Sequence, residues 1–166
     1  MNLKVKINKL HKNAVIPRYA KSGDAGMDLT ATSKLSNTTF QCTYGTGISI
    51  EIPKGYVGLV FPRSSIRNME LLLSNSVGVI DSGYRGEVQV TFIKTNGLDS
   101  LDYKVGDRIA QLIIIPYPQI EFEEVEELSE TERGTEGFGS TNLERGELIV
   151  VEIINKLWVE IIIKYC

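Results

Sequence analysis

The sequence predicts one all-β domain, and three observations support this prediction. The chain has 166 residues, of which 42% are hydrophobic and 23% charged, a composition typical of a globular domain with a single core. Short segments with alternating apolar and polar residues recur along the chain, as in half-buried strands. Turn-forming residues separate them at intervals typical of a β-sandwich, jelly roll or barrel, and not of βαβ units.

Three segments show the alternation clearly. They are residues 3–7 (LKVKI), 48–52 (ISIEI) and 87–92 (EVQVTF). In the third segment the two valines and the phenylalanine would lie on one face of a strand.

Turn signals separate the predicted strands. They occur at residues 53–55 (PKG), 81–84 (DSGY), 96–97 (NG) and 105–107 (VGD). Residues 68–75 (NMELLLSN) could form a short helix or an apolar strand, because a short apolar run does not distinguish the two.

Charge is unevenly distributed. The formal net charge is −3, but residues 121–132 hold seven of the 21 acidic residues, leaving 14 acidic against 18 basic residues elsewhere. A mildly basic body suits an anionic ligand. No lysine and arginine run and no basic stripe interleaved with aromatics indicates a nucleic-acid groove, so we expect no nucleic-acid partner. We expect the acidic run to be a solvated strand end and linker.

The N-terminus and the cysteines indicate a compartment. The first 13 residues carry too many charges for a signal peptide, and Cys42 and Cys166 lie far apart without CxxC spacing or a histidine cluster. We therefore expect neither a disulfide framework nor a structural zinc site. The sequence predicts a reduced, cytoplasmic protein.

The C-terminal residues 143–166 differ from the rest of the chain. Glu152, Lys156, Glu160 and Lys164 recur every four residues, so a helix would carry one polar stripe on an otherwise apolar surface. The β-branched residues favour a strand instead, and the charges argue against a membrane span, so no membrane association is expected. We expect this extension to be buried against the protein's own body or a neighbouring subunit. It is also a possible binding site for a protein partner.

Five segments have the composition of functional sites. They are residues 25–29 (AGMDL), 62–65 (PRSS), 75–86 (NSVGVIDSGYRG), 106–112 (GDRIAQL) and 133–141 (RGTEGFGST). Together they resemble, in order and spacing, the five motifs of the homotrimeric dUTPase family. The resemblance extends over about residues 3–142.

This resemblance implies a fold and a function. It implies a jelly-roll-like (β-clip) subunit, a homotrimer with active sites shared between subunits, and hydrolysis of dUTP to dUMP and pyrophosphate with Mg²⁺. Such an activity would keep uracil out of DNA and supply dUMP for dTMP synthesis. The chain would divide into a β domain (1–132), a glycine-rich arm (133–142) and an extension of unknown role (143–166).

Asp81 and Tyr84 are the candidates for catalysis and sugar selection. With Ser82 and Gly83 as a two-residue turn, they would be the opposed ends of a hairpin and lie side by side at a rigid tip. On the residues alone, Asp81 would be an ordinary Asx-turn residue. The resemblance implies instead that Asp81 is the general base for the water attacking the α-phosphorus. It also implies that Tyr84 packs on the deoxyribose and excludes a 2′-hydroxyl.

Asn75, Gly78 and Val79 correspond to substrate-binding positions of the family. An amide offers both a donor and an acceptor, and the uracil edge presents an N–H flanked by carbonyls, whereas cytosine presents a different pattern. Because other members recognise uracil with backbone groups alone, two interpretations of Asn75 stay open. Its side chain recognises the base, or it is an ordinary loop residue.

The phosphate contacts would come from two other motifs. The resemblance assigns Arg63, Ser64 and Ser65 to substrate binding and Gln111, beside the triphosphate, to the catalytic group. Guanidinium and hydroxyl donors suit oxygens that gain charge as pyrophosphate leaves. Ser65 stands where the family usually has glycine, and its side chain would crowd the phosphates if this position required a positive φ.

Asp28 corresponds to the acid that holds Mg²⁺ through coordinated waters. This ion keeps several waters and binds substrate phosphates, so one carboxylate is sufficient. Arg108 lies next to Asp107, and we expect it to form a structural ion pair rather than a ligand contact.

The glycine-rich arm would close over a neighbouring subunit's site. The resemblance places Phe138 on the uracil, Arg133 on the γ-phosphate, and Gly139 and Ser140 against the phosphates. Glycines would let the arm move, and closure would exclude water from the reaction. The residues from Leu143 onward depart from the family pattern, because the family arm normally ends close to its last motif.

Two alternative functions stay open. A dCTP deaminase shares the fold, although the complete Phe138 arm and the predicted Asp81/Tyr84 hairpin argue against it. A catalytically weak, dUTPase-like regulator could bind a protein partner through the apolar extension.

Overall fold

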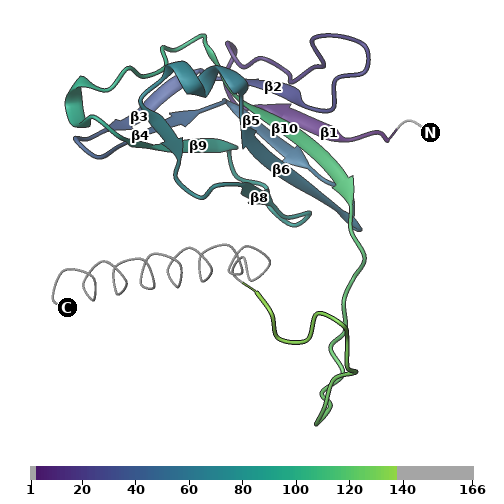
Figure 1. The fold of residues 1–166 in the computed structure, drawn as a ribbon. Coiled ribbons are helices and arrows are strands. Elements are labelled where there is room, and N and C mark those ends of the chain that lie inside the picture. The colour runs from purple at the N-terminus through teal and green to yellow at the C-terminus, as the bar shows by residue number, and fades with distance from the viewer. Residues whose placement is uncertain (1–2, 138–166) are drawn as a thin grey trace, which may run out of the picture. The chain divides into compact units, whose positions relative to one another are not determined.

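The computed structural model describes residues 3–137 and has the predicted all-β architecture (Figure 1). Ten strands and two short 3-10 helices follow one another in this part of the chain. The strands are β1 (Lys6–Lys9), β2 (Met27–Thr30), β3 (Ser33–Asn37), β4 (Gln41–Gly45), β5 (Ile48–Glu51), β6 (Tyr56–Pro62), β7 (Leu71–Leu73), β8 (Gly78–Ile80), β9 (Gln89–Lys94) and β10 (Arg108–Pro116), and the helices are η1 (Ser64–Asn68) and η2 (Gly97–Asp99).

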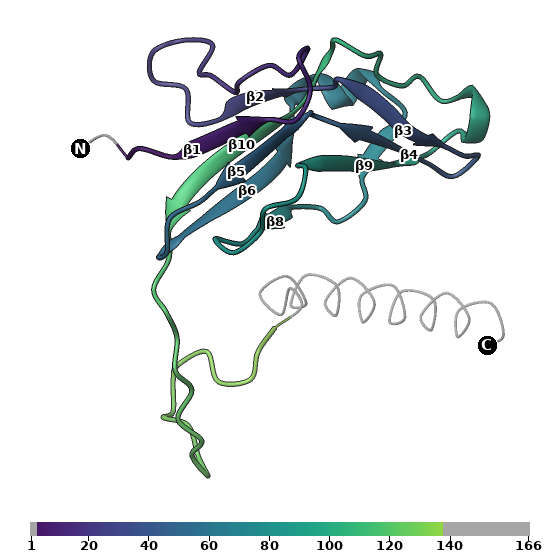
Figure 2. The ribbon, with the colours of Figure 1, turned by 180° about the vertical axis from the view of Figure 1, so that it is seen from behind.

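The strands form three antiparallel sheets. One sheet pairs β1 with β5, and two four-stranded sheets have the orders β2-β10-β6-β8 and β3-β4-β9-β7. Both views show β8 beside β6, whereas β9 lies beside β4 (Figures 1 and 2). The connection from β8 to β9, residues 81–88, therefore crosses from one four-stranded sheet to the other.

One hydrophobic core takes side chains from all three sheets. Tyr44 and Phe92 are fully buried, with ring centroids 6.1 Å apart in an edge-on arrangement, and both pack against Tyr103. Val88 and Val90 are buried with Phe92, which confirms the predicted apolar face of this segment. The core thus fixes both ends of the crossing between β8 and β9.

The β2-β10-β6-β8 sheet also has an apolar outer face. Val60 and Leu112 point into the core, so their neighbours Leu59 and Ile113 lie on the opposite face, where they are register partners. Val79, which pairs with Leu59 from the other side, is 63% exposed. A contiguous apolar face of this kind is typical of a surface that binds another chain.

Strand boundaries differ from the sequence predictions at several points. The first strand begins later than predicted, because its pairing with β5 starts at Lys6 opposite Glu51. Residues 68–75 contain the end of η1 and then β7, so the strand alternative is correct for the apolar run. The predicted strand at 48–52 is confirmed as β5, and the predicted strand at 87–92 is shifted to Gln89–Lys94.

The predicted hairpin around residues 81–84 is wrong, although its turn is present. The Tyr84 N–H donates to the Asp81 carbonyl at 3.1 Å and closes a β-turn over Ser82 and Gly83. The flanking strands do not pair with each other, because β8 pairs with β6 while β9 pairs with β4 and β7. The turn belongs to an irregular connection between two sheets.

The chain beyond Ile120 forms a second compact unit. Its described part, residues 121–137, contains turns but no helix or strand. The acidic residues 121–132 are exposed, as predicted, but they do not end a strand, since β10 stops at Pro116. The predictions for residues 143–166 lie outside the described residues. No helix within residues 3–137 is long and apolar enough to cross a membrane.

Candidate active site

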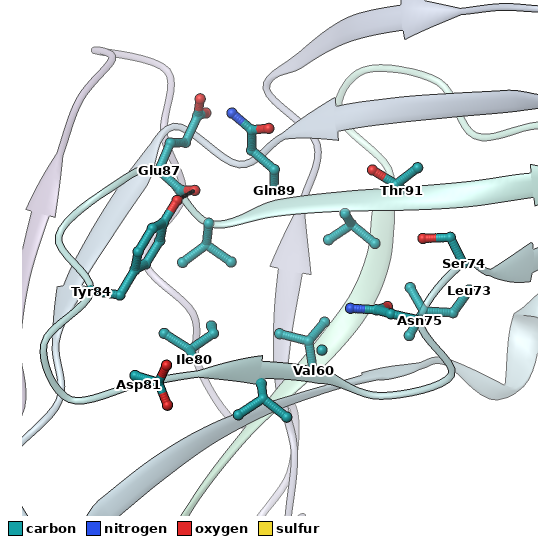
Figure 3. Close-up of a pocket in the computed structure, with 14 residues that line it drawn as sticks. Val60, Leu73, Ser74, Asn75, Ile80, Asp81, Tyr84, Glu87, Gln89 and Thr91 are labelled. Carbon is teal, nitrogen blue, oxygen red and sulfur yellow. Dashed lines mark hydrogen bonds between the residues drawn. The ribbon is translucent and has the colours of Figure 1, made fainter.

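A cavity of about 260 Å³ lies where the chain crosses between the two four-stranded sheets (Figure 3). Five predicted substrate-site residues line it, namely Asn75, Gly78, Val79, Asp81 and Tyr84. Asn75 and Tyr84 lie at opposite ends of the cavity, with the Asn75 amide pointing into it (Figure 3). The fold therefore brings together residues that the sequence placed in one motif.

Asp81 and Tyr84 share one end of the cavity. Asp81 follows directly after β8 and is exposed, and the turn that it begins is closed by the Tyr84 N–H. The Tyr84 ring stands between Asp81 and Glu87 in Figure 3, and its hydroxyl donates to the Glu87 carbonyl at 3.0 Å. A carboxylate that can activate water thus lies beside a ring that can pack against a sugar.

The other end of the cavity is a tight turn. The Ser76 N–H donates to the Leu73 carbonyl at 3.1 Å, and Ser76 has a φ of 58°. A left-handed conformation costs a non-glycine residue about 1–2 kcal/mol, and such strain is concentrated at binding loops. A Cβ at Gly78 would lie 3.1 Å from Val60 and 3.5 Å from Asn75 Nδ2. The absence of a side chain at residue 78 therefore lets its backbone, which lines the cavity, lie close to the Asn75 amide.

Three other residues that line the cavity were not predicted from the sequence, namely Glu87, Gln89 and Thr91. Gln89 and Thr91 lie on the polar face of β9, so the alternation in residues 87–92 could have indicated them. Glu87 also lines the cavity, and its Oε1 accepts a hydrogen bond from the Gly47 N–H at 2.7 Å. No local signal predicts this contact, because it joins residues 40 positions apart.

A second group of predicted residues gathers at the ends of β2, β6 and β10. Asp28 binds two guanidinium groups, with Arg63 Nε 2.7 Å from Oδ1 and Arg108 Nη1 3.0 Å from Oδ2. Arg108 therefore forms an ion pair, as predicted, but its partner is Asp28 and not the neighbouring Asp107. The carboxylate of Asp107 accepts the Lys104 N–H instead. One carboxylate between two guanidinium groups leaves an excess positive charge that suits an anion.

Gln111 lies beside this charged cluster. Its Nε2 donates to the Pro62 carbonyl at 3.0 Å, and a Cβ at Gly26 would lie 2.5 Å from Gln111 Oε1. Strand register places Gln111 opposite Asp28 on β2 and opposite Phe61 on β6. The amide is thus held over the ends of three strands.

Ser64 and Ser65 begin the 3-10 helix η1. Ser64 is exposed, and the Ser65 hydroxyl accepts a hydrogen bond from Arg63 Nη1 at 3.4 Å. Among the non-glycine residues of the described chain, only Ser76 has a positive φ. The backbone at residue 65 therefore does not require glycine, and the predicted crowding has no backbone cause.

The charged cluster and the cavity are separate in one chain. None of Asp28, Arg63, Ser64, Ser65 and Gln111 lines the 260 Å³ cavity. Within residues 3–137, no group of three or more His, Cys, Asp or Glu side chains is placed to hold a metal ion. The chain carries one part suited to a nucleoside and another suited to phosphate oxygens.

Arg133 belongs to the second unit. Its Nε donates to the Glu136 carbonyl at 3.1 Å, and the neighbouring Gly134 has a φ of 52° and donates its N–H to the Thr131 carbonyl. These turns are local to residues 131–136. The predicted contacts of Phe138, Gly139 and Ser140 lie outside the described residues.

Comparisons with known proteins show the family to which the chain belongs. The dUTPase family profile matches residues 12–142. The chain is 45% identical over 139 residues to the deoxyuridine 5′-triphosphate nucleotidohydrolase of Corynebacterium glutamicum, covering 82% of this chain and 93% of that protein. It is 42% identical over 137 residues to the same enzyme of Clostridium kluyveri, covering 81% of this chain and 95% of that protein.

The fold agrees with solved structures as well. The structure of Staphylococcus bacteriophage 80alpha dUTPase with dUPNHPP has a TM-score of 0.74 and 28% sequence identity to this chain, covering 84% of this chain and 98% of that one. The antiparallel all-β architecture is thus that of dUTPase structures. By sequence over most of its length and by fold, this chain belongs to the dUTPase family.

Proposed function

We propose that this protein hydrolyses dUTP to dUMP and pyrophosphate. The observation that carries the proposal is the arrangement of Asp81 and Tyr84 on one closed turn, at the end of a cavity that also presents the Asn75 amide. The membership of the chain in the dUTPase family supports the assignment of this cavity as the nucleoside site. The reaction would keep uracil out of DNA and supply dUMP for dTMP synthesis.

Asp81 acts as the general base. Its carboxylate takes a proton from water as the water oxygen bonds to the α-phosphorus. The bond from the α-phosphorus to the bridging oxygen then breaks, and pyrophosphate leaves. The hydrogen-bonded turn supports this role, because a base must be held in place relative to its water.

Base and sugar are selected at opposite ends of the cavity. The Asn75 side chain offers a donor and an acceptor to the uracil edge, which cytosine does not match. Tyr84 packs on the deoxyribose and leaves no room for a 2′-hydroxyl. The positions of these two side chains in the cavity support both assignments (Figure 3).

The charged cluster binds the triphosphate. Arg63, Ser64 and Ser65 donate to phosphate oxygens that gain charge as pyrophosphate leaves, and the Gln111 amide lies beside them. The excess positive charge around Asp28 supports this role.

Mg²⁺ is the cofactor, and Asp28 fits an indirect contact with it. Each Asp28 oxygen accepts one hydrogen bond from an arginine, which leaves lone pairs for water bound to the ion. A direct bond is less favourable, because both arginines already hold the carboxylate. Asp28 would hold the ion through its coordinated waters, and the bound ion would supply charge neutralisation as pyrophosphate leaves.

The protein acts as a homotrimer with shared sites. The separation of the cavity from the charged cluster supports this, because no residue of the cluster lines the cavity of the same chain. Gln111 and Ile113 lie on the same outer face of β10, so a copy packed on this apolar face would come close to the cluster. The arm, with Arg133, Phe138, Gly139 and Ser140, then closes over the assembled site.

A product assay tests the proposed function. The full chain is incubated with Mg²⁺ and either dUTP, UTP or dCTP, and nucleotides, pyrophosphate and ammonia are measured. We expect dUMP and pyrophosphate in equal amounts from dUTP, far slower hydrolysis of UTP, and no ammonia from dCTP. Ammonia release from dCTP would favour a deaminase instead, and an absence of dUMP would refute the proposal.

A further inference from the structure

We propose that Gly86 and Glu87 are positioning residues that set the preference for 2′-deoxyribonucleotides by holding the Tyr84 ring. The inference rests on the proposed function, since it deepens the sugar selection assigned to Tyr84. Nearly half of Tyr84 is exposed, so contacts with neighbouring side chains cover only part of the ring. Something else must hold the ring if it is to exclude a hydroxyl group.

Gly86 provides the space that the ring occupies. A Cβ at this position would overlap the Tyr84 hydroxyl oxygen and would lie 2.6 Å from Cζ and 2.9 Å from Cε2. Carbon atoms do not approach one another this closely without a shift of one group. Any side chain at residue 86 would therefore displace the outer half of the ring, and alanine is the smallest change that does so.

Glu87 holds the ring at its hydroxyl group. Its carbonyl accepts the hydrogen bond of the Tyr84 hydroxyl, while its carboxylate accepts the Gly47 N–H at 2.7 Å. A Cβ at Gly45 would lie 2.6 Å from Glu87 Oε1, so the absence of a side chain there makes room for the carboxylate. The acceptor for the ring is thereby tied to the buried turn between β4 and β5.

Further hydrogen bonds hold the same connection against this turn. Ser49 Oγ donates to the Arg85 carbonyl at 2.6 Å, and the Val88 N–H donates to the Ile48 carbonyl at 2.9 Å. Thr46 Oγ1 donates to the Val88 carbonyl at 2.6 Å. The connection is therefore anchored on both sides of Gly86 and Glu87. A disturbance at residue 86 acts on the exposed ring rather than on the backbone.

The test compares sugar discrimination in matched glycine variants. Gly86→Ala is compared with Gly83→Ala, which changes a glycine in the same connection where an added Cβ meets nothing within 4 Å. The ratio of kcat/KM for dUTP to that for UTP is measured, together with Kd for dUPNHPP and Ki for UTP. We expect the ratio to fall by roughly tenfold or more in Gly86→Ala and to stay within about twofold of wild type in Gly83→Ala.

A second pair of variants tests the anchor itself. Glu87→Ala removes the acceptor for Gly47, whereas Glu87→Gln keeps an acceptor oxygen of the same reach. We expect Glu87→Ala to lower the dUTP preference and Glu87→Gln to restore most of it. If Gly86→Ala does not fold, the two Glu87 variants still test whether this connection positions the Tyr84 ring.

The outcomes separate the inference from the function on which it rests. Unchanged discrimination in folded Gly86→Ala and Glu87→Ala variants, with discrimination lost in Tyr84→Ala, would overturn the positioning role and leave dUTP hydrolysis intact. A wild-type protein that does not form dUMP would instead refute the proposed function. An equal loss of dUTP preference in Gly83→Ala and Gly86→Ala would also overturn the inference. It would show that any added side chain in this connection lowers the preference, whether or not it meets the Tyr84 ring.

Discussion

At the residue scale, the proposed chemistry depends on a single carboxylate. Asp81 is exposed at the cavity rim, and the turn that it begins fixes its backbone. Asp81→Asn keeps the size of the side chain and removes its basicity. We expect turnover of dUTP to fall roughly 10²–10⁴-fold while Kd for dUPNHPP changes little. Turnover within threefold of wild type would show that another group is the base.

Tyr84 carries the second residue-scale prediction. Removing the ring in Tyr84→Ala opens the space that a 2′-hydroxyl would need, so the preference for dUTP over UTP should narrow. Steady-state kinetics with both nucleotides measure this preference. If discrimination is unchanged, groups other than the ring exclude the hydroxyl.

A third prediction concerns the glycine-rich arm. Phe138→Ala should raise KM or lower kcat for dUTP, because stacking an aromatic ring on a base is worth on the order of 1–3 kcal/mol in comparable sites. The trimer and its thermal stability should be unaffected. Sedimentation and thermal unfolding provide these controls, and unchanged kinetics would refute the contact.

Individual residues were predictable from the sequence to different degrees. Asp81 and Tyr84 could be placed together because a two-residue turn is a local feature. The pairing of Arg108 with Asp28 rather than Asp107 could not be predicted, since it joins residues 80 positions apart. The same holds for the contact of Glu87 with Gly47. Contacts of this kind depend on how the sheets fold onto each other.

At the element scale, strands were more predictable than their partners. Alternation identified β5 and the buried face of β9 correctly, because the period of two belongs to each strand alone. The hairpin prediction failed for the opposite reason. The turn itself was predicted correctly, but β8 pairs with β6 instead of β9. The helix η1 and the strand β7 lie between β6 and β8 in the sequence. Strand partners are decided by core packing across the whole chain.

The strand β4 gives an element-scale prediction about pH. Burial raises the pKa of the Cys42 thiol and of the Tyr44 phenol, and the phenol donates to the Tyr103 carbonyl at 2.7 Å. Both groups are neutral when protonated and have a higher pKa in the folded state. Their contribution to the free energy of unfolding is therefore complete below the pKa values of the unfolded state, about 8.5 for the thiol and about 10 for the phenol. It is lost as pH rises above these values.

Urea denaturation between pH 7 and pH 11 measures this loss. We expect the free energy of unfolding to fall by up to about 1.4 kcal/mol per pH unit for each group that the folded state keeps protonated. Tyr44→Phe should be less stable at pH 7, because the Tyr103 carbonyl loses its donor, and should show a shallower decline above pH 10. Equal slopes in both proteins would contradict a buried, protonated Tyr44.

At the scale of the whole molecule, the proposed dUTP site requires a second copy of the chain. The apolar outer face with Leu59, Ile113 and Val79 is the surface proposed for the contact between copies. Leu59→Glu should therefore produce monomers that keep the β fold but lose activity, because a carboxylate buried at an interface is strongly unfavourable. Leu72→Glu provides a control in the other four-stranded sheet, β3-β4-β9-β7, where Leu72 is an exposed strand leucine, whereas Leu59 is half-buried. Sedimentation velocity distinguishes trimers from monomers, and a trimeric, active Leu59→Glu protein would refute this interface.

Subunit mixing tests the central claim, that one copy's cavity and another copy's charged cluster form each dUTP site. Asp81→Asn damages only the cavity, and Arg63→Ala damages only the cluster. Each variant is first shown to be trimeric and nearly inactive, and the two are then refolded together in equal amounts. Random assembly gives an intact cavity beside an intact cluster in about a quarter of the sites, so about a quarter of wild-type turnover should return. Activity no greater than that of the two variants measured separately would contradict a shared site.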